Sequence, residues 1–535
     1  MMLLSRGLSV LVLLLGLSPV AHASLDDEID QAVGAIQAWD IRAATAHAAQ
    51  ALKLNPQDPT ALAVTGHVRL MQGRYTEAVD FLNQSVLLGG GDEIKRLLAL
   101  ATATAEVTRG YEEHVSSKGH FIIRHEPGVD AVMAPLLDEV LEEAWSQLIP
   151  LFGYEPRDPV RVVVYPRVEV LAAVSPLTVE EIKASGTIAL CKYNRLMITS
   201  PRDLVYGYGW ADTIAHELIH LLITKKSRNT VPIWLHEGLA KYYETHRRPG
   251  GESKLERRSE HLLAQALAKK ELVTFEEMSP SMAKLPTQEI TATAFAEVHT
   301  VIAFLEERAG SAIPIKLLEA MAAGSSDREA VAKVSGIPWS RFESSWRRYL
   351  RRLGLRTMDD VFDQRLLFRG HDTEADELEA LKGETGRKYV WLADRLRLKG
   401  RLGAAVKEYR KATREVGDAT PFIQAKLGGV LLELGRAEEA VDELMRPLPL
   451  HPDYMLLRLH LGHAHLRLGE LKKARRHLEA AIDINPYDPE VHGHLSQVYR
   501  GLGLDELATR ASRAHALVGR PHHQKSNRTE RHTDE

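Results

Sequence analysis

Two histidines and a glutamate in the segment His216-Glu217-Leu218-Ile219-His220 have the types and spacing needed to bind a metal ion. His216 and His220 are four residues apart, so on a helix they share one face, with Cβ atoms roughly 5–6 Å apart. Two imidazoles at that separation can bind one Zn²⁺ through nitrogen–metal bonds of about 2.0–2.1 Å. Glu217 lies one step round the same helix, where it can reach a metal-bound water without being a ligand. This H-E-x-x-H arrangement predicts a zinc site with Glu217 as the general base.

The motif alone is weak, because it arises by chance in roughly one chain in ten of this length and histidine content. The simpler explanation is a surface His–Glu pair on an amphipathic helix. The neighbouring residues argue against it, since two histidines and a carboxylate in a largely apolar helix would be costly to bury without a partner. A metal ion would be that partner. The apolar neighbours are Ile214, Leu218, Ile219, Leu221 and Leu222.

A third ligand distinguishes the kinds of H-E-x-x-H site. A metzincin would continue with Gly at position 223 and His at 226, whereas this chain has Ile223 and Lys226, which excludes that class. Downstream, Pro232 suits the first turn of a second helix, and that helix presents Glu237. Two histidines, one glutamate and a water give the open coordination of a catalytic zinc site.

The motif pair HELIH (216–220) and WLHEGLA (234–240) resembles the peptidase MA-like branch of the gluzincins, over about residues 111–355. By this resemblance, one Zn²⁺ is bound by His216, His220 and Glu237. Glu217 is then the base, and the fold is an α+β zincin domain. The resemblance implies a zinc metallopeptidase.

The chain departs from the thermolysin-like pattern in its spacing and at one residue. Sixteen residues separate His220 from Glu237, slightly fewer than in that pattern. An aspartate that orients a histidine in that pattern is replaced by Lys241, so the partner of the histidines is not identified. His236, beside Glu237, is a rival for the third ligand position, because adjacent helical residues point about 100° apart and only one of them faces the metal. The family pattern favours Glu237.

Peptide hydrolysis also needs a group that stabilises the oxyanion. Tyr242, Tyr243 and His299 are candidates, although buried tyrosines and lone histidines more commonly serve packing. The aminopeptidase motif G-x-M-E-N is absent, so nothing supports exopeptidase activity. The alternative is a non-catalytic exported adaptor with a structural zinc site, in which His236 would complete four protein ligands.

Composition argues against nucleic-acid binding and against internal disulfides. The net charge of −4 over 535 residues gives no electrostatic case for nucleic acid. The single cysteine, Cys191, excludes intramolecular disulfides. It lies in a strand-like run, where it is expected to be a small buried hydrophobe.

The N-terminal residues 1–23 read as a secretory signal. Arg6 provides the positive charge, an apolar core follows, and Ala21-His22-Ala23 gives a cleavage site with Ser24 as the mature start. An uncleaved anchor remains the alternative. No later segment is long and apolar enough to span a bilayer. The sequence thus predicts a periplasmic or secreted protein without a stable membrane span after cleavage.

The C-terminal part contains an internal repeat of 34–35 residues that resembles the tetratricopeptide repeat (TPR). Each glycine of the repeat is followed five residues later by an alanine, and Gly73 and Ala78 keep that offset near the N-terminus. Stacked repeats form concave surfaces that bind peptides or proteins, although a pure scaffold is the alternative. The C-terminal pairs are Gly400 and Ala405, Gly435 and Ala440, Gly469 and Ala474, and Gly503 and Ala508.

The middle region alternates strand-like and helix-like segments, which predicts an α+β zincin-type domain between all-α helical-repeat regions. Residues 186–191 and 195–199 read as a hairpin around Tyr193-Asn194. By resemblance, this hairpin either pairs with extended substrate or is an ordinary internal hairpin. The predicted order is a signal peptide (1–23), N-terminal TPR-like repeats (24–110), the metallopeptidase domain (111–355), a connector (356–385), C-terminal TPR repeats (386–518) and a disordered tail (519–535).

Overall fold

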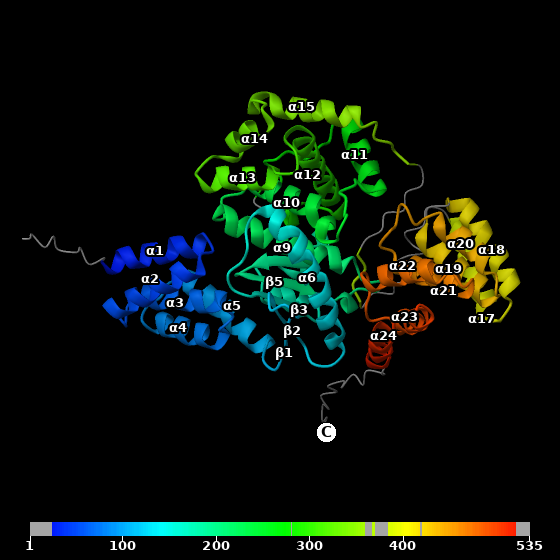
Figure 1. The fold of residues 1–535 in the computed structure, drawn as a ribbon, viewed down its shortest axis with the longest axis horizontal. Coiled ribbons are helices and arrows are strands. Elements are labelled where there is room, and N and C mark those ends of the chain that lie inside the picture. The colour runs from blue at the N-terminus through cyan, green and yellow to red at the C-terminus, as the bar shows by residue number, and fades with distance from the viewer. Residues whose placement is uncertain (1–23, 280, 359–365, 370–383, 418–419, 520–535) are drawn as a thin grey trace, which may run out of the picture.

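The computed structural model describes residues 24–279, 281–358, 366–369, 384–417 and 420–519. The predicted signal peptide, most of the predicted connector and residues 520–535 of the predicted tail lie outside the described residues. The chain is mostly helical, with one mixed sheet in the middle and stacked helices on both sides (Figure 1). None of the helices within the described ranges is both long and apolar enough to cross a membrane.

The N-terminal helices pack each against the next in the chain. A capping box between Ser24 and Asp27 begins the first helix, and the carboxylate of Asp58 accepts hydrogen bonds from the first backbone N–H groups of the third. The bounds are α1 (Leu25–Gln37), α2 (Ile41–Leu54), α3 (Pro59–Met71), α4 (Tyr75–Leu87) and α5 (Asp92–Val107).

The turn between α3 and α4 requires glycine. Gly73 has φ of +75°, and a Cβ atom there would lie 2.5 Å from Nε of Arg161 on the sheet.

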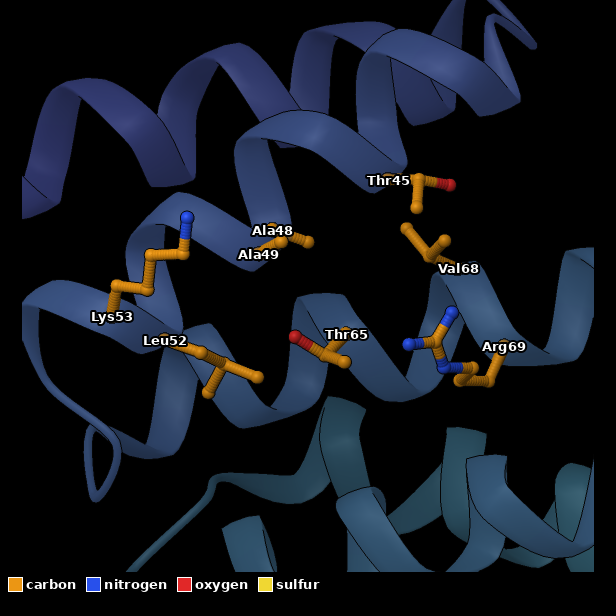
Figure 2. A pocket seen from close by; sticks show the side chains of 8 residues that line it. All are labelled: Thr45, Ala48, Ala49, Leu52, Lys53, Thr65, Val68 and Arg69. Atoms are coloured by element: carbon orange, nitrogen blue, oxygen red, sulfur yellow. The ribbon is translucent and has the colours of Figure 1, made fainter.

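A small cavity of about 230 Å³ lies between α2 and α3 (Figure 2). It is lined by Thr45, Ala48, Ala49, Leu52, Lys53, Thr65, Val68 and Arg69.

The sheet has five strands in the order β1-β2-β3-β5-β4. β2, β3 and β5 are parallel to one another, while β1 and β4 are antiparallel edge strands. Parallel inner strands are buried on both faces, and Val160 to Tyr165 is accordingly almost continuously apolar. The bounds are β1 (Glu112–Val115), β2 (Phe121–His125), β3 (Val160–Tyr165), β4 (Ala189–Lys192) and β5 (Arg195–Thr199).

The main core lies between this sheet and two long helices, α6 (Met133–Phe152) and α9 (Trp210–Ser227). α10 (Ile233–Tyr243) packs against α9, and α12 (Gln288–Ala309) packs against α10 and extends the same core. The other elements are η1 (Val129–Val132), α7 (Val168–Ala173), α8 (Val179–Ser185), η2 (Pro201–Asp203), η3 (Glu244–Arg247), α11 (Arg257–Lys269), η4 (Met282–Lys284), α13 (Ile313–Ala322), α14 (Asp327–Ser335) and α15 (Trp339–Arg352).

The C-terminal helices form a second stack with its own apolar clusters. The four repeat glycines have φ between +69° and +73°, and the four repeat alanines are buried. The glycines therefore lie at turns and the alanines at close helix contacts, as the resemblance to the tetratricopeptide repeat implies. The bounds are α17 (Glu384–Leu398), α18 (Leu402–Val416), α19 (Pro421–Glu433), α20 (Ala437–Met445), α21 (Met455–Arg467), α22 (Leu471–Ile482), α23 (Pro489–Gly501) and α24 (Asp505–Val518).

The predicted hairpin is confirmed. β4 and β5 pair antiparallel around Tyr193 and Asn194, whose φ values of 52° and 58° are those of a type I′ turn. The charged segment 247–258, which contains Pro249-Gly250-Gly251, predicts a loop or linker, and this expectation is corrected at Arg247. It is only 2% exposed and ends η3, because two carboxylates surround its guanidinium.

Candidate metal centre

The candidate site is formed by two consecutive helices. α9 carries His216, Glu217 and His220, and α10 carries His236 and Glu237. α9 ends because Arg228 and Asn229 adopt left-handed conformations, with φ of 57° and 61°. The short connection then returns the chain along α9, so that the polar residues of the two helices meet inside an apolar core.

The geometry brings one carboxylate oxygen to both imidazoles of the pair. Oε2 of Glu237 lies 3.2 Å from Nε2 of His216 and 3.3 Å from Nε2 of His220. The rings of His216 and His220 stand nearly perpendicular to one another, with centroids 4.5 Å apart. Ligand-capable atoms of His216, Glu217 and His220 also lie within 4.8 Å of one another.

The electrostatics of the cluster are those of tightly coupled opposite charges. Burial lowers the pKa of His216, but its hydrogen bonds to Glu237 and Glu244 outweigh that effect and raise the pKa to about 10. Burial acts to raise the pKa of Glu237, but the two imidazoles hold it well below its usual value. The cluster therefore favours an ionised Glu237.

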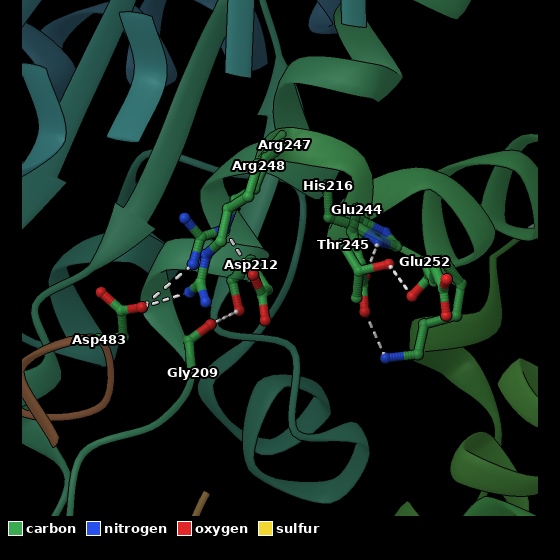
Figure 3. A network of polar contacts seen from close by, with 11 residues as sticks. Gly209, Asp212, His216, Glu244, Thr245, Arg247, Arg248, Glu252 and Asp483 are labelled. Carbon is green, nitrogen blue, oxygen red and sulfur yellow. Dashed lines mark hydrogen bonds and ion pairs between the residues drawn. The ribbon is translucent and has the colours of Figure 1, made fainter. Parts of the chain in front are cut away.

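His216 is oriented by a residue that the sequence analysis did not identify. Its Nδ1–H donates to Oε2 of Glu244 at 2.9 Å (Figure 3). Nζ of Lys241 donates to Oε1 of the same carboxylate at 2.6 Å. The bond to Glu244 turns Nε2 of His216 toward Glu237. Lys241 thus does not orient a histidine itself, but holds the glutamate that does. The available signal was the spacing: Glu244 lies seven residues, or two helical turns, after Glu237.

His220 is oriented by His236, the rival third ligand. The two Nδ1 atoms are 2.5 Å apart, and Nε2 of His236 lies 3.2 Å from Oγ1 of Thr224. Burial holds the pKa of His236 well below its usual value, so the ring is neutral. It can accept the Nδ1–H of His220 and donate its own Nε2–H to Thr224. His236 therefore lies on the side of His220 opposite Nε2, the nitrogen that faces Glu237.

Glu217 is 5% exposed, and its Oε2 has no hydrogen-bond partner in the part of the chain that is described. Burial raises its pKa, against the opposing effect of His220, His216 and the backbone of Cys191. Cys191 belongs to the edge strand β4, which packs beside α9. The carboxylate is thus held between the imidazole pair and the edge of the sheet.

The three candidates for oxyanion stabilisation are engaged elsewhere. The hydroxyls of Tyr242 and Tyr243 donate to the carboxylate of Glu306. The ring of His299 packs at a tilt against that of Tyr242, and its Nε2 lies 2.7 Å from Oγ of Ser253. The contacts described for these side chains join them to one another and not to the His216–His220 pair.

The C-terminal helices contact the start of α9. The buried guanidinium of Arg247 donates to Oδ1 of Asp212 at 2.5 Å and to Oδ2 of Asp483 at 3.2 Å (Figure 3). Asp212 lies one turn before His216, and Asp483 follows α22. Nε1 of Trp210 also donates to the carbonyl oxygen of Ile482 at 2.8 Å. The helix that carries the histidines is therefore fixed to the C-terminal stack at its first turn.

Comparison with family models finds one domain family and one repeat family in parts of the chain. The family model of the Peptidase MA superfamily matches residues 141–352, and two tetratricopeptide repeat models match residues 29–92 and 455–498. No curated protein matches the chain.

The solved structures similar to the chain show only loose superposition. A crystal structure of MamA is 19% identical over 28% of this chain and 91% of its own, with a TM-score of 0.24. The APC/C hetero-tetramer Cut9-Hcn1 is 11% identical over 93% and 80%, with a TM-score of 0.27. The P58(IPK) TPR domain is 12% identical over 90% and 89%, with a TM-score of 0.22. On the family matches, the chain contains a Peptidase MA superfamily domain with tetratricopeptide repeats on both sides.

Proposed function

We propose that the chain is an exported zinc-dependent peptidase in which His216, His220 and Glu237 bind one Zn²⁺ and Glu217 is the general base. The observation that carries this proposal is the position of Glu237, whose Oε2 lies 3.2 and 3.3 Å from the two Nε2 atoms. Two ligand atoms at about 2.0–2.1 Å from one tetrahedral ion lie about 3.4 Å apart. The two nitrogens and one oxygen therefore fit a zinc ion with its fourth position open.

Within this site, each residue has a distinct task. Bound zinc lowers the pKa of water toward about 7 and polarises a carbonyl group. Glu217 takes the proton of the attacking water and delivers it to the leaving amine. The raised pKa of Glu217 supports this role, because a weaker acid holds the transferred proton more readily. Glu244 and His236 keep the two imidazoles turned toward the ion.

The zincin α+β fold is part of the same proposal. β4 is an antiparallel edge strand beside the metal helix, and the backbone of its Cys191 contacts Glu217. An extended peptide that paired with this edge would pass close to the general base. This arrangement supports the hairpin as the substrate-binding strand.

The adaptor alternative needs a closed site with a fourth protein ligand. His236 was the candidate for that position. Its Nδ1 lies against Nδ1 of His220, whereas Glu237 faces the Nε2 atoms. The arrangement therefore favours an open, catalytic site over a structural one.

Export and partner binding complete the proposal. Ser24, the predicted first residue of the mature chain, caps α1 through its hydroxyl, so cleavage there would leave the helix start intact. Mass spectrometry of the protein recovered from the exported fraction should give Ser24 as the N-terminus. The repeats on both sides are proposed to bind the substrate or a protein partner.

The catalytic proposal is tested with Glu217→Gln. The variant should retain one zinc per chain by elemental analysis, and its digestion of an unfolded substrate such as casein should fall by at least 1,000-fold, as expected when a general base is lost together with its charge. Retained turnover would refute the role of Glu217. The matched control is Glu306→Gln, which removes a carboxylate bound to Tyr242 and Tyr243 and should leave both zinc and turnover unchanged.

The metal ligands are tested separately. Glu237→Gln and His220→Ala should lower the zinc content of the purified protein, and a chelator should abolish casein digestion by the wild-type chain. If Glu237→Gln bound zinc as tightly as the wild type, Glu237 would not be a ligand and the catalytic proposal would fail with it.

A further inference from the structure

Three arginines project from one face of the sheet, on three neighbouring strands. Arg161 on β3 is paired in register with Arg195 on β5. On β2, the residue paired with Arg161 is Ile122, so Arg124, two residues later, shares that face. The sheet alone thus collects three guanidinium groups beneath the N-terminal repeats.

The cation on β5 is buried, and it forms no ion pair with a carboxylate in the part of the chain that the structure describes. Arg195 is 1% exposed, and its Nε and Nη1 have no hydrogen-bond partner within the described ranges. The guanidinium carbon lies 5.2 Å from the ring centroid of Tyr75 and 5.7 Å from that of Tyr193. Nη2 of Arg195 donates a hydrogen bond to the carbonyl oxygen of Val174 at 3.4 Å. Aromatic faces attract a cation, but they do not satisfy its N–H groups.

Further unpartnered polar atoms surround Tyr75, which joins the N-terminal repeats to the sheet. The hydroxyls of Tyr75 and Tyr165 and Nε of Arg124 are buried without partners among the described residues. Arg124 lies on the same ring as Arg195, with its guanidinium carbon 5.9 Å from the Tyr75 centroid. Two cations thus share one ring, and several donors lack acceptors.

A cavity of about 590 Å³ opens at this junction and is lined by Tyr75 and Arg124, together with Gly73, Thr108 and Arg109. Its volume is in the range of about 300–1,000 Å³ that is usual for small-molecule sites. The acidic groups beside it do not neutralise the arginines. Glu77 is paired with Arg74 at 2.6 Å, Glu106 is exposed, and the half-exposed Glu113 reaches Arg124 only at 4.0 Å.

We propose that this junction binds a small oxyanion, a phosphate or a carboxylate, between the guanidinium of Arg124 and the hydroxyl of Tyr75, with Arg195 supplying further positive charge. Guanidinium groups form paired, charge-assisted hydrogen bonds with the oxygens of such anions. The bound anion would accept hydrogen bonds from Nε of Arg124 and from the hydroxyl of Tyr75.

The position of this site gives it a structural consequence. The turn that carries Gly73 and Tyr75 belongs to the N-terminal repeats, and Arg195 begins β5, directly after the hairpin turn. Nδ2 of Asn194 in that turn donates to the carbonyl oxygen of Met71 at 3.2 Å. The oxyanion would therefore strengthen the contact of the repeats with the β4–β5 hairpin.

The test is an anion titration of the full-length protein followed by thermal unfolding. Potassium phosphate and potassium acetate are compared with potassium chloride at equal ionic strength. We expect a saturable rise of the unfolding temperature with phosphate, with acetate or with both, and none with chloride. Saturation by phosphate alone would identify a phosphate site, and saturation by acetate a carboxylate site.

Two variants localise the effect. Tyr75→Phe keeps the ring and removes the hydroxyl, and Arg124→Gln removes a partly exposed cation, so both are expected to fold. Each should raise the half-saturating anion concentration at least tenfold. The control Arg42→Gln removes an exposed arginine of the same repeats and should respond like the wild type. No saturable response in the wild type, or an unchanged response in both site variants, would overturn the proposal.

Discussion

The two repeat regions contact opposite ends of α9, the helix that carries the histidines. One region uses backbone carbonyl groups and the other uses a carboxylate. At the C-terminal end of α9, the N-terminal repeats offer backbone carbonyl groups. Nζ of Lys225 donates to the carbonyl oxygen of Trp39 at 3.3 Å, and Nδ2 of Asn229 to that of Gln37 at 3.1 Å. At the first turn of α9, the C-terminal repeats offer the carboxylate of Asp483 to the buried guanidinium of Arg247.

The difference matters because the ion pair of Arg247 with Asp483 is directly connected to residues that support the candidate metal centre. Arg247 binds Asp212, one helical turn before His216, and lies three residues after Glu244, which orients His216. The contact with the backbone carbonyl groups is made by Lys225 and Asn229, which lie at or beyond the last turn of α9, five and nine residues past His220. The C-terminal repeats are thus tied to the start of α9 and to the segment that carries Glu244, and the N-terminal repeats to the end of α9.

The largest effect is expected from Arg247→Met, which breaks the charged contact and leaves two carboxylates without their buried cation. We expect the free energy of unfolding to fall by about 2–3 kcal/mol and the zinc affinity to drop roughly 10–100-fold, as when a group that supports a ligand is lost. Urea unfolding measures the first and chelator competition the second. Arg248→Ala is the matched control. Arg248 is half exposed and contacts the same Asp483, so its loss should cost below about 1 kcal/mol. Equal losses of stability and of zinc affinity in the two variants would contradict the difference between the buried Arg247 and the half-exposed Arg248.

A more selective change is Glu244→Gln, which keeps an acceptor for the Nδ1–H of His216 but removes its charge. Zinc affinity should fall roughly 10-fold or more, because the neutral amide no longer increases the basicity of the imidazole. Glu252→Gln, which alters an exposed carboxylate of the following loop, should leave zinc affinity unchanged. Zinc affinity equal to the wild type in Glu244→Gln would show that this carboxylate does not support the site.

On the other side of the site, Thr224→Val tests the neutral orientation of His220 through His236. Replacement of the hydroxyl leaves the Nε2–H of His236 without its acceptor while keeping the side-chain shape. We expect a decrease of a few-fold in zinc affinity, and a smaller effect than that of Glu244→Gln, because one neutral hydrogen bond contributes only about 1 kcal/mol. The same competition assay ranks the two variants, and the reverse order would contradict the contrast between a charged and a neutral support.

The smallest effect is expected from Asn229→Asp, which removes the amide donor to Gln37 but keeps a residue that tolerates the left-handed conformation. The exposed contact should contribute below about 1 kcal/mol to stability, and zinc affinity should not change. A loss of zinc affinity would show that the N-terminal repeats also control the site and would remove the asymmetry.

Much of the local structure could be read from the sequence, because short-range physical rules fix it. The i, i+4 spacing of His216 and His220 places both rings on one helical face, and the observed ring separation follows from it. The repeat glycines lie in left-handed turns, and the valine-rich run from Val160 to Tyr165 forms a strand. Turn and strand preferences act within a few residues, so features of this kind are written in the local sequence.

The residues that orient the candidate metal ligands could not be predicted from the sequence in the same way. Glu244 was not identified because the family pattern placed the expected carboxylate at the position of Lys241. His236 remained a rival ligand, because helical spacing gives the direction of a side chain but not its partner. The burial of Arg247 was missed, since its partner Asp483 lies 236 residues away in sequence.

The sequence by itself determined which residues could form the site and the repeats, because side-chain chemistry and helical periodicity are local properties. The tertiary structure alone decided which carboxylate faces both imidazoles, which residues orient the imidazoles, and which repeat region contacts which end of α9. It also placed three arginines of neighbouring strands under the N-terminal repeats. These outcomes depend on how separate helices and strands pack, and packing brings together residues whose distance along the chain carries no signal.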